Sequence, residues 1–160
     1  MNPFDLSGKV ALVTGANTGI GQGIALALAR AGADIAALAR SEPADTLDQV
    51  RASGRRCVWI AAEFGCAPPA GDIVPRVVAE LGGLDILINN AGTIRRNDAL
   101  AFTEAEWDEV VDVNLKSAFF LAQQAARHWV SRASGGKVIN IASMLSFQGG
   151  IRVASYTASK

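Results

Sequence analysis

Residues 9–21 read Lys-Val-Ala-Leu-Val-Thr-Gly-Ala-Asn-Thr-Gly-Ile-Gly, a short apolar run that ends in a turn with three glycines. The apolar part lacks the alternation of a half-exposed strand, which indicates a strand buried on both faces. An Ala- and Leu-rich stretch at residues 24–30 follows the turn and favours a helix. A buried strand, a glycine turn and a helix form the unit from which the fold prediction starts.

The same alternation continues along the chain. Thr103 and Glu106 have the spacing of a capping box, which predicts a long helix from there to about Arg132. Strands that alternate with helices favour right-handed crossovers within one parallel sheet. We predict an α/β fold, a Rossmann-like doubly wound parallel sheet of order 3-2-1-4-5, in one domain over residues 1–160. The other expected strands are 34–39, 57–62, 84–88 and 137–142, and the other expected helices lie near 46–52 and 73–81.

Composition argues against several classes of protein. The chain carries 15 basic and 15 acidic residues with no basic stripe, so we expect no nucleic-acid partner. No apolar run is long enough to span a membrane, and residues 1–9 lack the pattern of a signal peptide. Cys57 and Cys66 have neither metal-ligand spacing nor a secretory context. We therefore expect a cytoplasmic protein with reduced cysteines and no metal.

The glycine turn is suited to a dinucleotide. Glycines let the backbone turn sharply and approach a pyrophosphate, and the following helix presents free N–H groups and a partial positive charge. The spacing is G-x3-G-x-G and differs from the general G-x-G-x-x-G fingerprint. We predict cofactor contacts from this turn, at Gly15, Asn17, Thr18, Gly19, Ile20 and Gly21.

The residues after the second strand bear on the choice between NAD and NADP. In such folds an acid there binds the adenosine ribose, whereas an Arg suits a 2′-phosphate. Here Ala39 takes the acid position and Arg40 follows, which favours NADP(H). Glu42 is placed to reach the ribose or to repel a phosphate, and Arg40 as an ordinary surface charge is an equal alternative. The choice stays open at this stage.

Four further features follow in order: Asn-Asn-Ala-Gly at residues 89–92, Asn114, Ser143, and Tyr156 with Lys160 four residues on. With the glycine turn, they resemble the classical short-chain dehydrogenases/reductases over the whole chain. The resemblance implies a short-chain NAD(P)-dependent dehydrogenase that interconverts a secondary alcohol and a ketone. It implies catalytic roles for Asn114, Ser143, Tyr156 and Lys160. It also implies cofactor contacts by Glu63, Asn89, Ala91, Gly92, Tyr156 and Lys160.

The spacing of Tyr156 and Lys160 has a chemical purpose. Residues four apart on a helix share a face. A free tyrosine ionises near pH ~10 and is a poor base at neutral pH, but a nearby ammonium favours the phenolate. Tyr156 would then exchange a proton with the substrate oxygen. The family resemblance gives Ser143 the task of holding that oxygen, Lys160 the nicotinamide ribose, and Asn114 a water that links Lys160 to solvent.

A narrower likeness points to a sugar-acid branch of the family, which acts on 3-deoxy sugar acids such as 2-dehydro-3-deoxy-D-gluconate or 2-deoxy-D-gluconate. It lies in residues 143–153, 94–96 and 19–23 and in Glu42-Pro43. The branch favours NAD(H), and the family is usually a homotetramer. A sugar acid carries a carboxylate, which Arg binds well. We expect substrate contacts by Ser143, Gln148 and either Arg152 or Arg95, with surface solvation of the arginines as the alternative.

Members of the family continue past the catalytic Lys, so we expect a C-terminally incomplete domain, truncated before strands 6 and 7. The fifth strand would then be an exposed edge, and residues 1–160 alone would be inactive and prone to aggregate. Two other functions stay open, a 3-ketoacyl carrier-protein reductase and a non-catalytic dinucleotide-binding fragment.

Overall fold

The computed structural model describes residues 3–65 and 70–160, so Cys66 lies outside the described residues. Five parallel strands form one sheet in the order β3-β2-β1-β4-β5, as predicted. The strands are β1 (Val10–Thr14), β2 (Asp34–Ala39), β3 (Cys57–Ala61), β4 (Ile86–Asn89) and β5 (Lys137–Asn140). The chain thus has the predicted Rossmann-like α/β fold.

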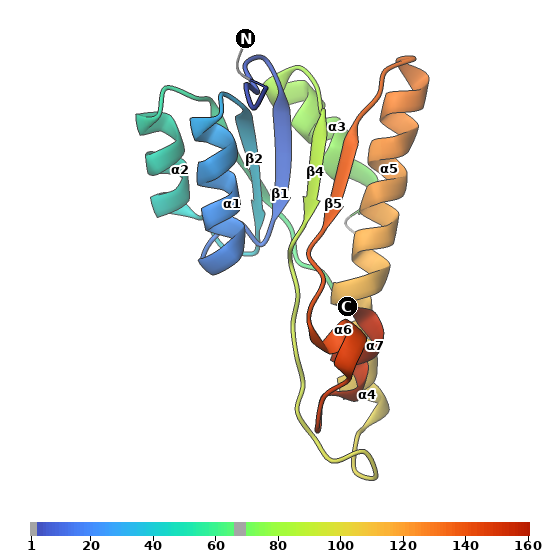
Figure 1. Cartoon of the computed structure of the whole chain (residues 1–160). Coiled ribbons are helices and arrows are strands. Elements are labelled where there is room, and N and C mark those ends of the chain that lie inside the picture. Colours follow the sequence, from blue (N-terminus) through green and yellow to red (C-terminus); the bar gives the residue numbers. More distant parts are fainter. Residues whose placement is uncertain (1–2, 66–69) are drawn as a thin grey trace.

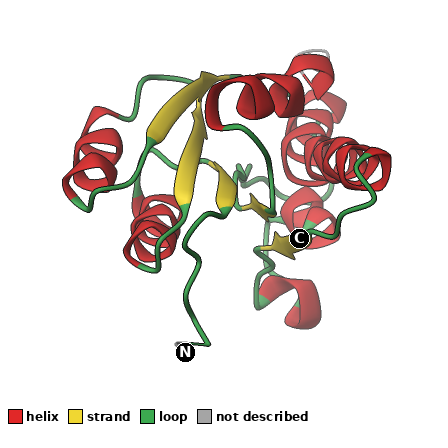
Figure 2. Cartoon of the chain, turned by 90° about the horizontal axis from the view of Figure 1, so that it is seen from above, coloured by secondary structure: helices red, strands yellow, loops and turns green. Residues whose placement is uncertain are grey.

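Helices cover both faces of the sheet (Figures 1 and 2). One face packs on α1 (Gly19–Arg30) and α2 (Ala44–Ala52), and the other packs on α3 (Ala70–Leu81) and α5 (Ser117–Ser131). In β1 the alternate residues Ala11 and Val13 enter the first core, and Leu12 enters the second. A strand buried on both faces has to be apolar, which explains the unbroken run at residues 10–13, and the buried Thr14 ends the strand.

The remaining helices lie beyond the carboxyl ends of the strands (Figure 1). They are α4 (Glu104–Val111), the π-helical segment η1 (Asp112–Lys116), α6 (Leu145–Gln148) and α7 (Ala154–Ser159). The capping box is confirmed, because the Thr103 side chain accepts from the N–H of Glu106 and the Glu106 carboxylate accepts from the N–H of Thr103. These short helices place polar side chains at the carboxyl edge of the sheet.

The long helix predicted from Thr103 to about Arg132 is confirmed as the contiguous run of α4, η1 and α5, but the π-helical turn at η1 was not predicted. Ser117 donates both its backbone N–H and its hydroxyl to the carbonyl of Asp112, five residues back. This i→i−5 bonding widens one turn, and such insertions occur often at functional sites. Sequence periodicity did not reveal it, because the interruption keeps the helix axis continuous.

Other boundaries move by a few residues. Helix α1 begins at Gly19 and not near residue 24, because close packing of the first helical turn requires glycine and outweighs its low helix propensity. Strand β4 begins later than expected, and β3 and β5 end sooner, which leaves Glu63 and Ser143 in loops past their strands. Val138 and Ile139 of β5 are 41% and 48% exposed, as predicted for an edge strand, whereas Ile141 packs against the core.

No helix within residues 3–65 and 70–160 is long and apolar enough to cross a membrane.

The start of β2 is held by an ion pair to the start of β3. The Asp34 carboxylate accepts from the backbone N–H of Arg56 at 2.9 Å and from Nε of Arg56 at 2.8 Å. Nη2 of Arg56 also donates to the carbonyl of Leu81 at the end of α3. Burial raises the pKa of Asp34, but the hydrogen bonds from Arg56 outweigh it and hold that pKa below its ordinary value.

We predict that Asp34→Asn lowers the free energy of unfolding by about 1 kcal/mol at pH 7, since one partner is exposed. A lowered folded-state pKa gives stability that is present above the unfolded value, near ~3.9, and is lost as the pH falls. The difference between variant and wild type in urea unfolding should therefore shrink below about pH 4. Asp48→Asn, which removes an exposed i,i+3 partner of Arg51, is the matched control and should cost little. Equal losses for the two variants at pH 7 would contradict the assignment.

Candidate functional site

The glycine turn between β1 and α1 is closed tightly. Gly15 has a φ of +65° and donates its N–H to the carbonyl of Leu38 at 2.9 Å. A Cβ on Gly21 would lie 2.1 Å from the carbonyl oxygen of Gly15, so no side chain fits there. Gly19 also has a positive φ, with open space beside it. The turn therefore has the glycine-dependent backbone that the dinucleotide prediction requires.

The tip of this turn is exposed. Asn17, Thr18 and Ile20 all lie at the surface, with Ile20 67% exposed. Asn17 lines the cavity described below, and Thr18 precedes α1 without a side-chain capping bond. The N-terminus of α1 thus faces outward with unpartnered backbone N–H groups, as an anion site needs.

The hydroxyl of Thr14 joins the turn to the loop after β4. It donates to the carbonyl of Ile88 at 3.2 Å and accepts from the N–H groups of Asn90 and Ala91, both at 2.9 Å. The Asn90 side chain donates to the carbonyl of Thr14 at 2.9 Å. These bonds hold the Asn-Asn-Ala-Gly loop against the glycine turn.

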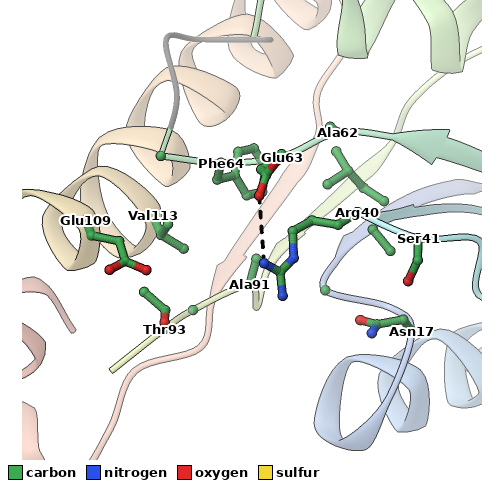
Figure 3. A pocket seen from close by; sticks show the side chains of 15 residues that line it. Asn17, Arg40, Ser41, Ala62, Glu63, Phe64, Ala91, Thr93, Glu109 and Val113 are labelled. Atoms are coloured by element: carbon green, nitrogen blue, oxygen red, sulfur yellow. Dashed lines mark ion pairs between the residues drawn. The ribbon is translucent and has the colours of Figure 1, made fainter. Parts of the chain in front are cut away.

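A cavity of about 410 Å³ opens at the carboxyl edge, over the ends of β1, β2, β3 and β4 (Figure 3). Gly15, Arg40, Glu63, Ala91 and Gly92 of the predicted cofactor residues line it, together with Asn17. The sequence prediction missed Ser41, Phe64 and Thr93, which directly follow predicted residues, and also Glu109 and Val113, which come from α4 and η1. The sites expected at separate strands therefore do lie around one cavity.

Asn89 lies away from this cavity. It is 6% exposed, and its amide donates to Oδ1 of Asn140 at 2.9 Å and to the carbonyl of Ala118 at 3.2 Å. It thus ties β4 to β5 and α5. The family motif implied a cofactor contact by Asn89, but its side chain does not line the cavity.

Asn114 sits in η1 and is 6% exposed. Its Oδ1 accepts from the N–H of Thr93 at 2.8 Å, and its Nδ2 donates to the carbonyl of Thr93 at 3.0 Å and to Oγ of Ser159 at 3.1 Å. One side chain therefore fixes both the loop after β4 and the last turn of α7. The role of Ser159 was not predicted, because its sequence separation from Asn114 hides the contact.

Lys160 reaches the same place from the end of α7. Its Nζ donates to the carbonyl of Ile141 at 2.8 Å, and a Cβ on Gly92 would lie 3.2 Å from that Nζ. Partial burial lowers the pKa of Lys160. The backbone N–H of Lys160 donates to the carbonyl of Tyr156 at 3.0 Å, so the two residues are one helical turn apart, as predicted.

Ser143 and Tyr156 precede this lysine in the chain. Tyr156 is half-buried in α7, and Ser143 lies three residues beyond the end of β5. The Oγ of Ser143 accepts from the N–H of Leu145 at 3.2 Å, which caps the turn into α6. Ser143, Tyr156 and Lys160 all come from the segment that follows β5.

The two arginines predicted to bind a substrate carboxylate are already paired. Arg95 forms a two-pronged ion pair with Glu109, and its Nη1 donates to the carbonyl of Ile94. Arg152 makes one contact, from Nε to Oδ1 of Asp98 at 2.9 Å. The guanidinium of Arg152 therefore retains more free donors than that of Arg95.

Arg152 also has an unusual backbone. Its φ is +64°, in the left-handed region that residues other than glycine and asparagine rarely adopt. Its carbonyl accepts from the N–H of Asn97, which ties the loop after β4 to the loop before α7. Gln148 is exposed at the end of α6, which lies beyond the carboxyl ends of the strands (Figure 1). Within the described residues, no group of three or more His, Cys, Asp or Glu could hold a metal.

The chain is similar to proteins of a known family. Residues 9–160 match the short chain dehydrogenase family. The chain is 55% identical over 160 residues to a 2-dehydro-3-deoxy-D-gluconate 5-dehydrogenase of Escherichia coli (strain K12), and 53% identical to one of Dickeya dadantii (strain 3937). Each match covers 100% of this chain and 63% of the relative, so the chain spans less than two thirds of these curated relatives.

A solved structure is also similar to this chain. An Agrobacterium tumefaciens protein provisionally assigned as a 2-deoxy-D-gluconate 3-dehydrogenase, with bound NADP, is 49% identical with a TM-score of 0.91. The match covers 99% of this chain and 63% of that protein.

We predict that Thr14→Val lowers the free energy of unfolding by about 1–3 kcal/mol, because the isosteric side chain leaves the N–H of Ala91 without its acceptor. Thr14→Ser, which keeps the hydroxyl, should lose less than half of that. Urea unfolding followed by circular dichroism measures both. A valine variant as stable as the serine variant would contradict the role given to this hydroxyl.

Proposed function

The chain belongs to the short-chain dehydrogenase family, and from that premise we propose that it carries the dinucleotide site and catalytic residues of an NAD(P)-dependent oxidoreductase. The reaction is the interconversion of a secondary alcohol and a ketone on a 3-deoxy sugar acid. The main support for the proposal is that Gly92, Asn114 and Lys160 lie close together beside the cavity. Three separate segments thus meet at one partly buried lysine.

The residues present fit a dinucleotide. Gly15 and Gly21 allow the tight turn, the N-terminus of α1 offers free N–H groups, and the cavity extends to Arg40 and Glu63. The glycine turn and α1 would hold the pyrophosphate, and the loop at Ala91 and Gly92 would lie along the nicotinamide half. When bound, the nicotinamide supplies or accepts the hydride.

The protein's own residues would handle the proton. Tyr156 exchanges a proton with the substrate oxygen, and Ser143 donates a hydrogen bond that holds that oxygen. Lys160, one helical turn from Tyr156, would bind the nicotinamide ribose. Partial burial lowers the pKa of this lysine, so its charge is lost at a lower pH than that of a surface lysine.

Asn114 has a positioning role in this scheme. Its side chain is occupied by Thr93 and Ser159, and it thereby fixes the loop and the helix that bring Gly92 and Lys160 together. A water linking Lys160 to solvent, as the family resemblance implies, would use the second lone pair of Oδ1 or the backbone carbonyl of Asn114.

For the sugar-acid carboxylate we favour Arg152 over Arg95. Arg95 already has both prongs on Glu109, whereas Arg152 has a single, exposed partner in Asp98. A substrate carboxylate can displace an exposed partner at small cost. Gln148 and Ser143 would complete the substrate side.

We also propose that the protein acts as a homotetramer in the cytoplasm. Leu115, Phe119 and Phe120 are 50%, 60% and 41% exposed on η1 and α5, an apolar surface of the kind that oligomers bury. The exposed Val138 and Ile139 of β5 support the proposal that residues 1–160 alone turn over slowly and tend to associate.

The reaction can be tested on two proteins, the 160-residue chain and a chimera that adds the part of the E. coli relative outside the matched region. We expect the chimera to oxidise or reduce a 3-deoxy sugar acid with NAD(H) or NADP(H), and the chain alone to show little turnover. Tyr156→Phe in the chimera should lower kcat by about 100- to 10,000-fold while nucleotide binding persists.

Three outcomes would count against the proposal. Turnover of an acetoacetyl thioester but not of the sugar acid would favour a ketoacyl carrier-protein reductase. Nucleotide binding without turnover in the chimera would favour a non-catalytic module. Unchanged kcat in Tyr156→Phe would remove the proposed acid–base residue.

The carboxylate assignment has its own test. We predict that Arg152→Asn raises KM for the sugar acid by about tenfold or more, because a charge-assisted pair is lost. Asn tolerates the positive φ at this position, so the backbone is kept. Arg95→Leu is the comparison and should change KM less. If KM is unchanged in Arg152→Asn, this arginine does not bind the carboxylate.

A further inference from the structure

Arg40 and Glu63 both line the cavity, and their side chains point toward each other (Figure 3). Arg40 is the first residue after β2, and Glu63 is the second after β3. These strands are parallel neighbours, with Ala39 paired to Ala61, so both side chains leave the sheet at the same edge. Nη1 of Arg40 lies 3.7 Å from Oε1 of Glu63.

The pair is loose and accessible. The Arg40 side chain is 79% exposed and that of Glu63 is 62% exposed. Exposed pairs of this kind are weak, and an arginine has five N–H donors, most of which this single contact leaves free. Arg40 is therefore able to exchange Glu63 for another anion.

The two candidate nucleotides differ at one group that matters here. A 2′-phosphate carries up to two negative charges at neutral pH and accepts from a guanidinium in two-pronged fashion, whereas a 2′-hydroxyl is neutral. With the hydroxyl, the Arg40–Glu63 pair can stay closed and both charges remain compensated. With the phosphate, a two-pronged contact turns Arg40 away from Glu63, so the free energy of that ion pair is subtracted from phosphate binding.

We propose that Glu63 sets the discrimination between NADP(H) and NAD(H) by competing with the 2′-phosphate for Arg40. This rests on the proposed function, since it presupposes that the cavity binds a nicotinamide dinucleotide. In this scheme Glu63 determines cofactor specificity. Arg40 binds the 2′-phosphate of NADP(H), and it stays paired with Glu63 when NAD(H) is bound.

The experiment measures Kd for NADPH and NADH by nucleotide fluorescence, using the 160-residue chain. Glu63→Gln should lower Kd for NADPH by about two- to fivefold, because the free energy of an exposed ion pair corresponds to a change of that size. It should change Kd for NADH less than about twofold. Arg40→Gln should raise Kd for NADPH by about tenfold or more. In the double variant, Glu63→Gln should no longer improve NADPH binding.

Glu42→Gln is the matched control. Glu42 lies two residues after Arg40 and is exposed, but it is not among the residues that line the cavity. Its neutralisation changes net charge equally, so a general charge effect would shift NADPH binding as much as Glu63→Gln does. We expect a smaller shift, and equal shifts would overturn the proposal.

Two further results are decisive. A Glu63→Gln effect that is equal for both nucleotides, or that survives Arg40→Gln, overturns the competition while leaving the proposed function intact. Absence of binding of either nucleotide to the folded wild-type chain overturns the proposed function, and this inference with it. Thermal shifts produced by each nucleotide give a second readout of the same ratio.

Discussion

The hydroxyl of Thr14 carries the connection on which the site depends. It receives two backbone N–H groups from the loop after β4 and donates to the carbonyl of Ile88, so the ends of β1 and β4 cannot separate. Parallel strands leave such backbone groups unpaired where they end, and buried unpaired groups are costly. With the loop held in this way, Gly15 lies against Asn90 and Gly92 lies within reach of Lys160.

The second constraint is the π-helical turn. By bonding Ser117 to the carbonyl of Asp112, it shifts the helix by part of a turn and aims Asn114 at both the loop after β4 and α7. A regular α-helix would present residue 114 at a different angle. The position of Lys160 therefore depends on this local departure from regular geometry, because Asn114 bonds to the neighbouring Ser159 and the carbonyl of Ile141 accepts from Nζ of Lys160.

Charge at the carboxyl edge is arranged in pairs. Three arginines around the site each have an acidic partner: Arg40 with Glu63, Arg95 with Glu109, and Arg152 with Asp98. The pairs differ in how firmly they hold, from a two-pronged contact at Arg95 to a 3.7 Å contact at Arg40. A loosely held arginine can change partners when an anionic ligand enters, whereas a doubly held one acts as a structural tie.

The sequence by itself determined the fold and six of the fifteen residues that line the cavity. Buried parallel strands have to be apolar without alternation, and glycine is needed where the backbone bends into positive φ. Runs such as residues 10–13 and turns such as 15–21 can therefore be recognised from the local sequence. Only the tertiary structure decided which side chains meet. Asn114 with Ser159, and each arginine with its carboxylate, are contacts between separate elements. Local periodicity does not encode such pairings, because they arise from the packing of the whole sheet and its helices.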